Sequence, residues 1–381
     1  AAEFSAHNGL YFALKNKGED VDSLLNAQTN GDFIPNAAEV MFRERHEISP
    51  TLIEGYFSCP YKNFSERGLR LMPRIEGAVR PLDTGDFMHA VLQRTAESFR
   101  TFDSEQACVA FARGQAEKLL SEAPFCYLKD TNAGKFTAGA LENEAGVVAA
   151  ELYRQIACSA FTVWGAEKKF GGRDADFAGI TLLSGERDLR LSGKIDRIDR
   201  GGDYVRVVDY KTGSLIEADA DSYYTGRRLQ LQLYMSAVSA YAKPAGAYYF
   251  PARISFARQG EDYPFRMQGF SLADEEAVKM SDVALEKGGK SRFVNATLGR
   301  NSDKQMNGDD FEAFIDYSRL AALGCAREIE KGCIAPSPYG GVCEYCPYGG
   351  VCGADAKKAR KESAVKCAEI AKIVKKRRGE L

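Results

Sequence analysis

The residues best suited to chemistry lie in one stretch, GKIDRIDRGGDYVRVVDYK, at residues 193–211. Its alternating apolar and charged residues predict two strands joined by a hairpin turn in the GGD sequence. Side chains two apart on a strand share a face, so Asp209 and Lys211 are expected to point the same way. A turn centred between the second glycine and the aspartate of GGD places Asp196 opposite Asp209. Two carboxylates and an ammonium then converge on one side of a sheet.

This convergence predicts a site for a divalent cation. Two carboxylates about 4 Å apart repel each other by roughly 4 kcal/mol at an effective dielectric constant of 20. Mg²⁺ prefers oxygen ligands, uses one or two carboxylates, and leaves positions for water and phosphate. The ammonium of Lys211 would then stabilise charge on a reacting phosphate or orient the attacking water. The alternative is a solvated hairpin with alternating charges, which is what we expect of Arg197, Asp199 and Arg200.

Two further motifs carry polar residues that are uninformative on their own. His89 is one of three histidines and lies in TGDFMHAVL, where a lone histidine on a helix more often packs or caps. Gln230 and Tyr234, in LQLQLYMSA, are four residues apart and therefore share a helix face. Such a pair is equally typical of core packing. Arg227 and Arg228 precede this helix and are candidates for phosphate contacts.

The ten cysteines include one cluster. Cys343, Cys346 and Cys352 follow the pattern C-x₂-C-x₅-C, which favours metal binding over disulfides in a chain without a secretion signal. A closed site needs a fourth thiolate, for which Cys59 in SCPYKNF is the candidate and Cys333 the rival. Zinc sites usually pair two C-x-x-C motifs, so three local ligands and one distant ligand favour a [4Fe–4S] cluster over zinc. The remaining cysteines are expected in the core: Cys108, Cys126, Cys158, Cys325 and Cys367.

The composition is that of an ordinary globular protein, with 45% hydrophobic and 27% charged residues in a chain of 381. The net charge of −2 leaves any nucleic-acid contact to a local basic surface. No apolar run reaches membrane-spanning length and no signal peptide opens the chain, so we expect a cytoplasmic protein without a membrane partner. The first residue is Ala rather than Met, from which we expect a piece of a longer protein or a processed chain.

The periodicity of the chain predicts helices that flank a small mixed sheet. Residues 177–211 alternate in the manner of strands, and AGAYYFPARISF is a further strand limited by Pro251. This pattern gives an α/β class in three parts: an N-terminal segment 1–47, a main domain 48–355 and a basic C-terminal helix 356–381. The last part fits a solvated helix and a contact with DNA backbone equally well. Helical patterns cover 48–71, 85–99, 103–122, 141–164, about 227–242, 272–287 and 309–330.

The order of these motifs resembles that of a known family. His89, GKID with Asp196, DYK with Asp209 and Lys211, and the Gln230-x-x-x-Tyr234 pair resemble the RecB-type exonucleases of the PD-(D/E)XK superfamily. The motifs SCPYKNF, DYKTG and CEYCPYGGVC are together similar to the nuclease domain of the AddB component of AddAB-type helicase–nucleases. The resemblance covers roughly residues 48–355.

The resemblance implies a restriction-endonuclease-like core and a Mg²⁺- or Mn²⁺-dependent DNA exonuclease. The implied metal ligands are His89, Asp196, Asp209 and the carbonyl of Tyr210; Lys211 is catalytic, and Gln230 and Tyr234 shape the site and touch DNA. A [4Fe–4S] cluster is implied on Cys59, Cys343, Cys346 and Cys352. The implied partners are DNA and an AddA-like helicase subunit, in the processing of double-strand breaks for recombination, where this module cuts the 5′-terminated strand.

Two other interpretations remain open. One is a stand-alone exonuclease of the same superfamily, such as those that serve CRISPR adaptation. The other is a binding module that grips DNA through a nuclease-like fold with a structural metal site. The Asp196, Asp209 and Lys211 set argues against the second interpretation, since a protein that only binds DNA has no use for carboxylates that repel each other.

Overall fold

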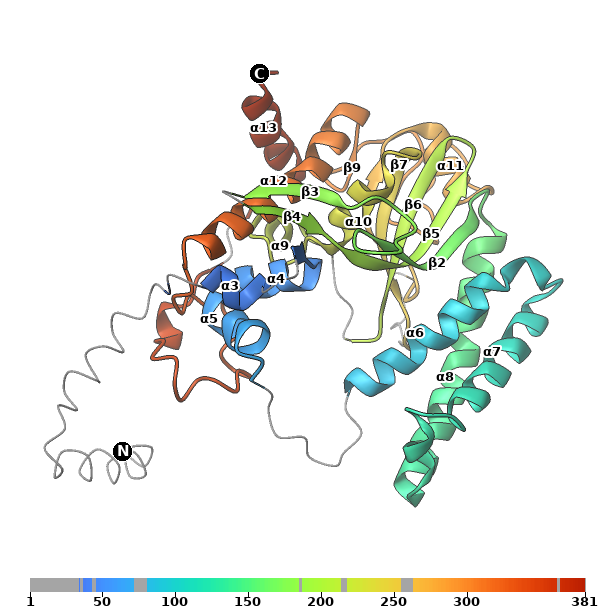
Figure 1. Ribbon diagram of the computed structural model, residues 1–381. Helices are drawn as coiled ribbons and strands as arrows, with labels where there is room; N and C mark the ends of the chain where they lie inside the picture. Colours follow the sequence, from blue (N-terminus) through green and yellow to red (C-terminus); the bar gives the residue numbers. More distant parts are fainter. Residues whose placement is uncertain are drawn as a thin grey trace, which may run out of the picture.

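The computed structural model describes residue 34 and the ranges 37–42, 46–71, 81–184, 187–213, 218–254, 263–361 and 364–380. Most of the predicted segment 1–47 lies outside the described residues, and its boundary stays a prediction. Figure 1 shows a mixed sheet with helices packed around it, which confirms the α/β class. No helix among the described residues is long and apolar enough to cross a membrane.

Most of the predicted helices form, several with shorter bounds. The α-helices are α3 (Ala37–Phe42), α4 (Pro50–Ser58), α5 (Pro60–Asn63), α6 (Pro81–Glu97), α7 (Glu105–Leu119), α8 (Asn132–Ala157), α9 (Ala220–Tyr224), α10 (Gln230–Val238), α11 (Glu275–Ser281), α12 (Gly308–Glu330) and α13 (Cys367–Arg378). A π-helical turn spans Phe64–Gly68, and 3₁₀ turns span Phe99–Thr101, Cys126–Lys129 and Ala356–Lys358.

The strands form two sheets. The strands are β1 (Glu47–Ile48), β2 (Thr162–Phe170), β3 (Ile180–Ser184), β4 (Arg187–Leu191), β5 (Gly193–Gly201), β6 (Tyr204–Lys211), β7 (Lys243–Pro251), β8 (Gln268–Leu272) and β9 (Gln305–Met306). The smaller sheet has the order β1-β4-β3, and the larger has the order β2-β5-β6-β7-β8-β9. The larger sheet is mixed, because β5 is antiparallel to both β2 and β6 whereas β6 runs parallel to β7.

The β5–β6 hairpin forms in the predicted register. Gly201 pairs with Tyr204, which leaves Gly202 and Asp203 as the two residues of the turn. Gly202 has φ +53°, a conformation that glycine adopts without steric cost. The parallel neighbour β7 ends at Pro251, as the sequence predicts, because proline lacks the N–H that would continue the ladder.

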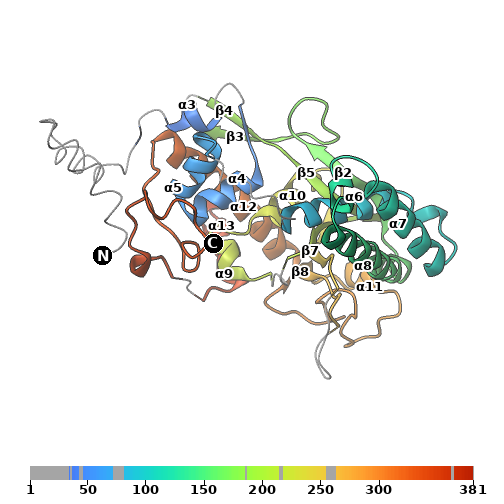
Figure 2. The same ribbon diagram turned by 90° about the horizontal axis from the view of Figure 1, so that it is seen from below.

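Helices cover both faces of the larger sheet. Side chains of β6 belong to two hydrophobic clusters: Val205 and Val207 lie in the cluster that includes α10 and α12, whereas Val208 and Tyr210 lie in the cluster that includes α6, α7 and α8. Figure 2, which views the molecule from below, shows α6–α8 at one end, α3–α5 at the other, and α10 between them. The hairpin is therefore buried on both faces, which alternation alone does not reveal.

The segment 48–71, predicted as one helix, is divided at Cys59. Helix α4 begins as predicted, with Ser49 accepting from the Leu52 N–H at 3.2 Å and Pro50 at its first position. It ends because Cys59 is extended, at φ −165° and ψ 114°, before α5 starts at Pro60.

The sequence patterns miss four strands, the two-residue strands β1 and β9 and the longer strands β2 and β8, and they make several helices too long. The helical pattern covers residues 141–164, yet α8 ends at Ala157 and the edge strand β2 begins at Thr162. Strand β8 occupies Gln268–Leu272, just before helix α11, which is shorter than its pattern.

The basic C-terminal stretch is helical mainly from Cys367. Tertiary contacts override the helical pattern before that point. The guanidinium of Arg360 donates to the carbonyls of Phe57 and Ser337, at 2.6 Å each, and its backbone N–H donates to the carbonyl of Pro338. The chain is thereby held against the end of α4 instead of continuing a helix.

Candidate active site

Three carboxylates come from three adjacent strands of the larger sheet. Arg197 pairs with Val208 between β5 and β6, and the same register places Asp196 beside Asp209, as predicted. On the other side of Asp196, β2 carries Glu167 between two residues that pair with Arg197 and Ile195. Asp196 and Asp209 are both buried, with 6% and 1% of their surfaces exposed. Carboxylates that are buried side by side repel each other unless a cation binds between them or one of them takes up a proton.

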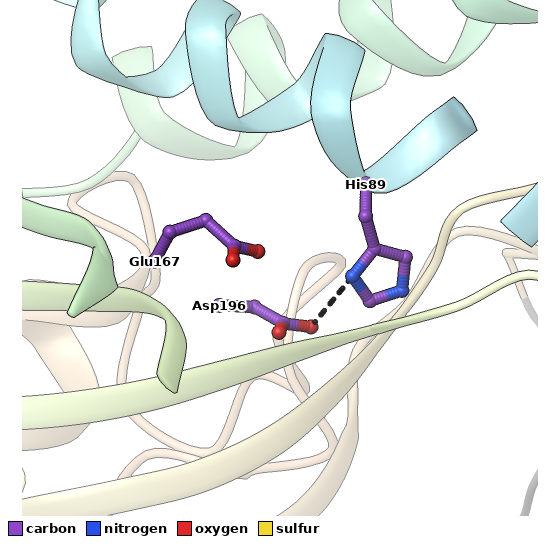
Figure 3. Close-up of side chains that lie close together, drawn as sticks. All are labelled: His89, Glu167 and Asp196. Atoms are coloured by element: carbon purple, nitrogen blue, oxygen red, sulfur yellow. Dashed lines mark ion pairs between the residues drawn. The ribbon is translucent and has the colours of Figure 1, made fainter. Parts of the chain in front are cut away.

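His89 reaches the same point from helix α6. Its Nδ1 lies 3.3 Å from Oδ2 of Asp196, and the same carboxylate oxygen accepts the backbone N–H of Tyr210 at 2.8 Å. Figure 3 shows His89, Glu167 and Asp196 facing one another, with His89 coming from the helix above the sheet. One ligand atom from each of the three lies within 4.8 Å of the others, the one such group among the described residues.

Lys211 is held by a chain of contacts that leads to α10. Its Nζ lies 2.5 Å from Oδ2 of Asp209 and donates to Oε1 of Gln230 at 2.9 Å. Gln230 in turn donates from Nε2 to the hydroxyl of Tyr234 at 2.7 Å. The ring of Tyr249 lies 5.2 Å from the ammonium. The structure thus brings together Asp209, Lys211, Gln230 and Tyr234, which the sequence selected from separate motifs.

The electrostatics of the site are those of crowded carboxylates. Burial raises the pKa of Asp209 to about 7, and the charge of Asp196 adds to the rise although Lys211 opposes it. The pKa of His89 is raised: burial lowers it, but the hydrogen bond and charge of Asp196 outweigh burial. Burial likewise raises the pKa of Glu167, with Lys194 opposing. A divalent cation bound among these groups would compensate the buried negative charge that raises the pKa of Asp209 and Glu167.

Glu167 is a site residue that the sequence reasoning missed. Its backbone has φ +52°, a left-handed conformation that costs a side-chain-bearing residue roughly 1–2 kcal/mol. The carboxylate pairs with Lys194 and faces His89 and Asp196. The available signal is TVWGAEKKF, whose β-branched and aromatic residues favour a strand. Extending the preceding helix to residue 164 conceals it.

A second missed residue, Glu54, lies behind Lys211. The Glu54 side chain on α4 accepts the backbone N–H groups of Leu229 and Gln230 through one oxygen, at 2.7 and 2.8 Å. Nothing in the local sequence of α4 could have indicated this contact, because the partners are 175 and 176 residues apart.

The prediction that the rest of the hairpin charges are solvated was wrong for two of three residues. Arg197 and Asp199 have no exposed surface, and only Arg200 lies at the surface. Asp199 lies 3.0 Å from Nε of Arg197 and accepts from Nε of Arg206 at 2.9 Å. Arg197 also donates to Gln155 of α8 at 2.6 Å. These residues form a buried ion network behind the site, next to α8.

The four predicted cluster ligands lie in one region. Burial raises the pKa of Cys343, and the negative charges of Cys59, Cys346 and Cys352 raise it further, so these thiols are neighbours. The rival Cys333 instead interacts with Glu328 and Lys331. Among the described residues, no three of these sulfur atoms lie as close together as the ligand atoms of His89, Glu167 and Asp196 do. The [4Fe–4S] cluster and its ligand set therefore stay predictions.

The other cysteines match the core prediction only in part. Cys108, Cys325 and Cys367 are buried, whereas Cys126 is exposed and Cys158 is partly exposed. Cys126 and Cys158 lie at helix ends, in the 3₁₀ turn before α8 and just after α8, where one side of the chain faces solvent.

The phosphate contacts of Arg227 and Arg228 stay a prediction. Arg227 is partly buried, stacks over Tyr339 at 4.5 Å and donates to Ser222 and Thr225 at 3.2 Å each. These contacts connect α9 to the region of the clustered cysteines.

Comparison with known proteins gives relatives that include B subunits of ATP-dependent helicase/deoxyribonucleases. The one from Desulforudis audaxviator is 29% identical over 355 residues, which cover 82% of this chain and 30% of the relative. Those from Caldanaerobacter subterraneus subsp. tengcongensis and Geobacillus thermodenitrificans are 26% and 28% identical over 350 residues each, with 82% and 80% of this chain and 30% of each relative covered. The chain spans about 30% of the length of these relatives.

A family model also covers the site. The model described as the PD-(D/E)XK nuclease superfamily matches residues 47–353, which include all three carboxylate strands, His89, Lys211 and the clustered cysteines. The mixed sheet flanked by helices fits that fold, and the predicted resemblance is confirmed. The chain belongs to the PD-(D/E)XK nuclease superfamily.

Proposed function

We propose that this chain is a metal-dependent deoxyribonuclease, an exonuclease that hydrolyses phosphodiester bonds of DNA with Mg²⁺ or Mn²⁺. The observation that carries the proposal is the convergence of Asp196 and Asp209 beside Lys211, with His89 adjacent. Buried carboxylates side by side, with the pKa of Asp209 raised by burial and by the charge of Asp196, fit a hard divalent cation, which takes oxygen ligands and neutralises them.

Each residue of the site has a distinct proposed role. His89, Asp196, Asp209 and the carbonyl of Tyr210 would hold the cation, and Glu167 lies close enough to Asp196 to join them. The cation supplies Lewis-acid polarisation of the scissile phosphate and a more acidic water. Lys211 would direct its ammonium at the reacting phosphate or its attacking water, and Gln230 keeps that ammonium in place. Tyr234 fixes Gln230 and, with it, would touch the DNA.

The chain is proposed to work as the nuclease module of a helicase–nuclease in double-strand break repair and recombination. This rests on the name of the relatives, which combines a helicase with a deoxyribonuclease and designates one subunit of a larger enzyme. An AddA-like helicase subunit is the corresponding partner, and the cytoplasm the corresponding location. A stand-alone exonuclease of the same superfamily is the alternative, and it would be favoured if an AddA-like helicase subunit neither bound the chain nor changed its cleavage of DNA ends.

A [4Fe–4S] cluster on Cys59, Cys343, Cys346 and Cys352 is proposed as a structural staple of the fold. The electrostatic effect of Cys59, Cys346 and Cys352 on the pKa of Cys343 supports the set, and the separate surroundings of Cys333 argue against that residue as a ligand. The cluster would tie residues near the start of the nuclease domain to residues near its end. None of the four is among the proposed catalytic residues, so its function would be structural.

The experiment that tests the enzyme proposal is a cleavage assay on end-labelled single-stranded and duplex DNA. Anaerobically purified protein should degrade DNA with Mg²⁺ or Mn²⁺ and should stop when EDTA removes the metal. DNA binding without cleavage under all these conditions would instead favour the non-catalytic binding module. Comparing 5′-labelled with 3′-labelled strands identifies the strand that is cut.

A further inference from the structure

Helix α10 carries Gln230 at its first position and begins without a cap of its own. The residue before it is Leu229, whose side chain has no hydrogen-bonding atom, and no side chain at that position caps the helix. The first backbone N–H groups of a helix have no partner within the helix and need an external acceptor. For α10 that acceptor comes from a different part of the chain.

Glu54 supplies it. One oxygen, Oε1, accepts the N–H of Leu229 at 2.7 Å and that of Gln230 at 2.8 Å. The negative charge also lies at the positive end of the α10 dipole, where it is stabilising. The Glu54 carboxylate is partly buried and interacts electrostatically with Lys211. It is therefore linked to the catalytic ammonium both by charge and through Gln230.

Helix α4, which carries Glu54, is fixed at both ends. Ser49 caps its first turn, as described above. At its other end the carbonyl of Phe57 accepts from Arg360 at 2.6 Å, and that of Ser58 accepts the N–H of Tyr339 at 3.1 Å. A carboxylate on a helix fixed in this way can locate the start of another helix accurately.

We propose that Glu54 is a positioning residue for the reaction: by capping α10 it holds Gln230 where Gln230 can hold Lys211. The inference rests on the proposed nuclease function and adds a residue to its machinery. Without the cap, the first turn of α10 loses its acceptor and Gln230 is free to move away from the ammonium. Misplacement of a reacting group by about 1 Å can cost on the order of 10²-fold in rate.

Two substitutions of Glu54 separate its hydrogen bonds from its other roles. Glu54→Ala removes both hydrogen bonds, and we expect kcat for DNA cleavage to fall on the order of 10²-fold with KM almost unchanged. Glu54→Gln keeps a carbonyl oxygen in the place of Oε1, and we expect it to recover kcat to near the wild-type value. Equal loss in the Gln and Ala variants, or a wild-type rate in the Ala variant, would overturn the proposal.

Asp274 offers a matched control. It caps α11 in the same manner, with Oδ1 accepting the N–H groups of Glu276 at 3.0 Å and Ala277 at 3.2 Å. Asp274→Ala should lower the melting temperature about as much as Glu54→Ala while leaving kcat at the wild-type value. A similar fall of kcat in both variants would indicate a general loss of structure and would contradict a positioning role.

Two further measurements do not depend on cleavage. Hydrogen exchange at the amides of Leu229 and Gln230, and the rate of acylation of Lys211 by an activated ester, should both rise in Glu54→Ala but not in Glu54→Gln. If the wild type cleaves no DNA, the proposed function fails while these two measurements still decide the positioning role. Unchanged exchange and unchanged acylation in Glu54→Ala would overturn it.

Discussion

Burial of negative charge in the site is most unfavourable at Asp209. It is buried beside Asp196, and the ammonium of Lys211 at 2.5 Å compensates only part of that cost, because the pKa of Asp209 stays raised. A fold maintained for stability alone would place an apolar residue here. The retained carboxylate is best explained by a ligand that binds it, and a divalent cation has the required charge and ligand preference.

Lys211 is expected to act on the phosphate and to contribute nothing to metal binding. Lys211→Ala should lower cleavage by about 10²–10³-fold, the usual effect of removing a group that stabilises charge in the transition state. Titration calorimetry with Mn²⁺ should give an affinity no weaker than that of the wild type, since a nearby positive charge is gone. A large loss of Mn²⁺ affinity would contradict the role given to Lys211.

The raised pKa of Asp209 makes a prediction about stability and pH without metal. The folded protein holds a proton on Asp209 up to about pH 7, whereas an unfolded chain loses it near its ordinary pKa of about 3.9. The stability from this proton is complete below the unfolded pKa and is lost as the pH rises through about 7. In EDTA, the melting temperature of the wild type should therefore fall between about pH 4 and pH 8 relative to Asp209→Asn. If the melting temperatures of the two proteins change in parallel with pH, the pKa of Asp209 is not raised in the folded protein.

The part of the site that follows from local periodicity could be predicted from the sequence. Strand alternation and a two-residue turn place Asp196, Asp209 and Lys211 together, and the structure has this register. Glu167 and Glu54 could not be found in the same way. Glu167 depends on an edge strand whose start is hidden by the helical pattern before it, and Glu54 acts on a helix 175 residues further along the chain.

The β5–β6 hairpin is the element that connects the site to the core. Besides the carboxylates of the site it carries Arg197, Asp199 and Arg206, which are buried and reach α8 through Gln155. Alternation predicted which residues share a face. It could not predict that these charged residues are covered, because that depends on where α6–α8 pack.

The buried network behind the hairpin should be sensitive to loss of its aspartate. Asp199→Ala leaves Arg197 and Arg206 buried without it, and breaking such a pair typically costs about 3–5 kcal/mol. Arg200→Ala on the same strand is the control, because Arg200 is exposed and a surface change of this kind stays within about 0.5 kcal/mol. Urea unfolding measures both; equal, small effects would show that Asp199 is not structurally important.

Helix α4 and the loop that carries Cys343, Cys346 and Cys352 form a second part of the structure with a testable role. Cys59 ends α4, and if it binds a cluster with Cys343, its replacement by Ala should lose iron and lower the melting temperature. Cys333→Ala should change neither. Iron analysis and thermal unfolding of oxygen-free preparations compare the two variants. If Cys59→Ala keeps its full iron content while Cys333→Ala loses iron, the proposed ligand set is wrong. If the wild type contains stoichiometric zinc and no iron, the proposed iron–sulfur cluster is wrong.

At the scale of the whole molecule, parts of the chain that are distant in the sequence contact each other. The end of α4 contacts Tyr339 and Arg360, and the N–H of Ile34 donates to the carbonyl of Gly332 at 2.9 Å. Such contacts close loops of about three hundred residues, and closing a longer loop adds only slowly to the entropic cost. Sequence patterns predicted the fold class but not these contacts, since periodicity carries no information about partners far along the chain.

The proposed position in a larger assembly also belongs to this scale. The chain covers about 30% of the relatives' length, so the helicase–nuclease activity in their name is not assigned to this chain alone. What can be tested on the chain itself is whether its own site cuts DNA.

The most direct test of that claim is DNA cleavage by wild type, Asp209→Asn and Asp203→Asn in Mg²⁺, with DNA binding measured in parallel. Asp203 is an exposed aspartate in the turn of the same hairpin and serves as the control. We predict that Asp209→Asn binds DNA and melts as a folded protein but has lost cleavage by at least about 10²-fold, while Asp203→Asn cleaves like the wild type. Cleavage by Asp209→Asn at the wild-type rate would contradict the proposed active site.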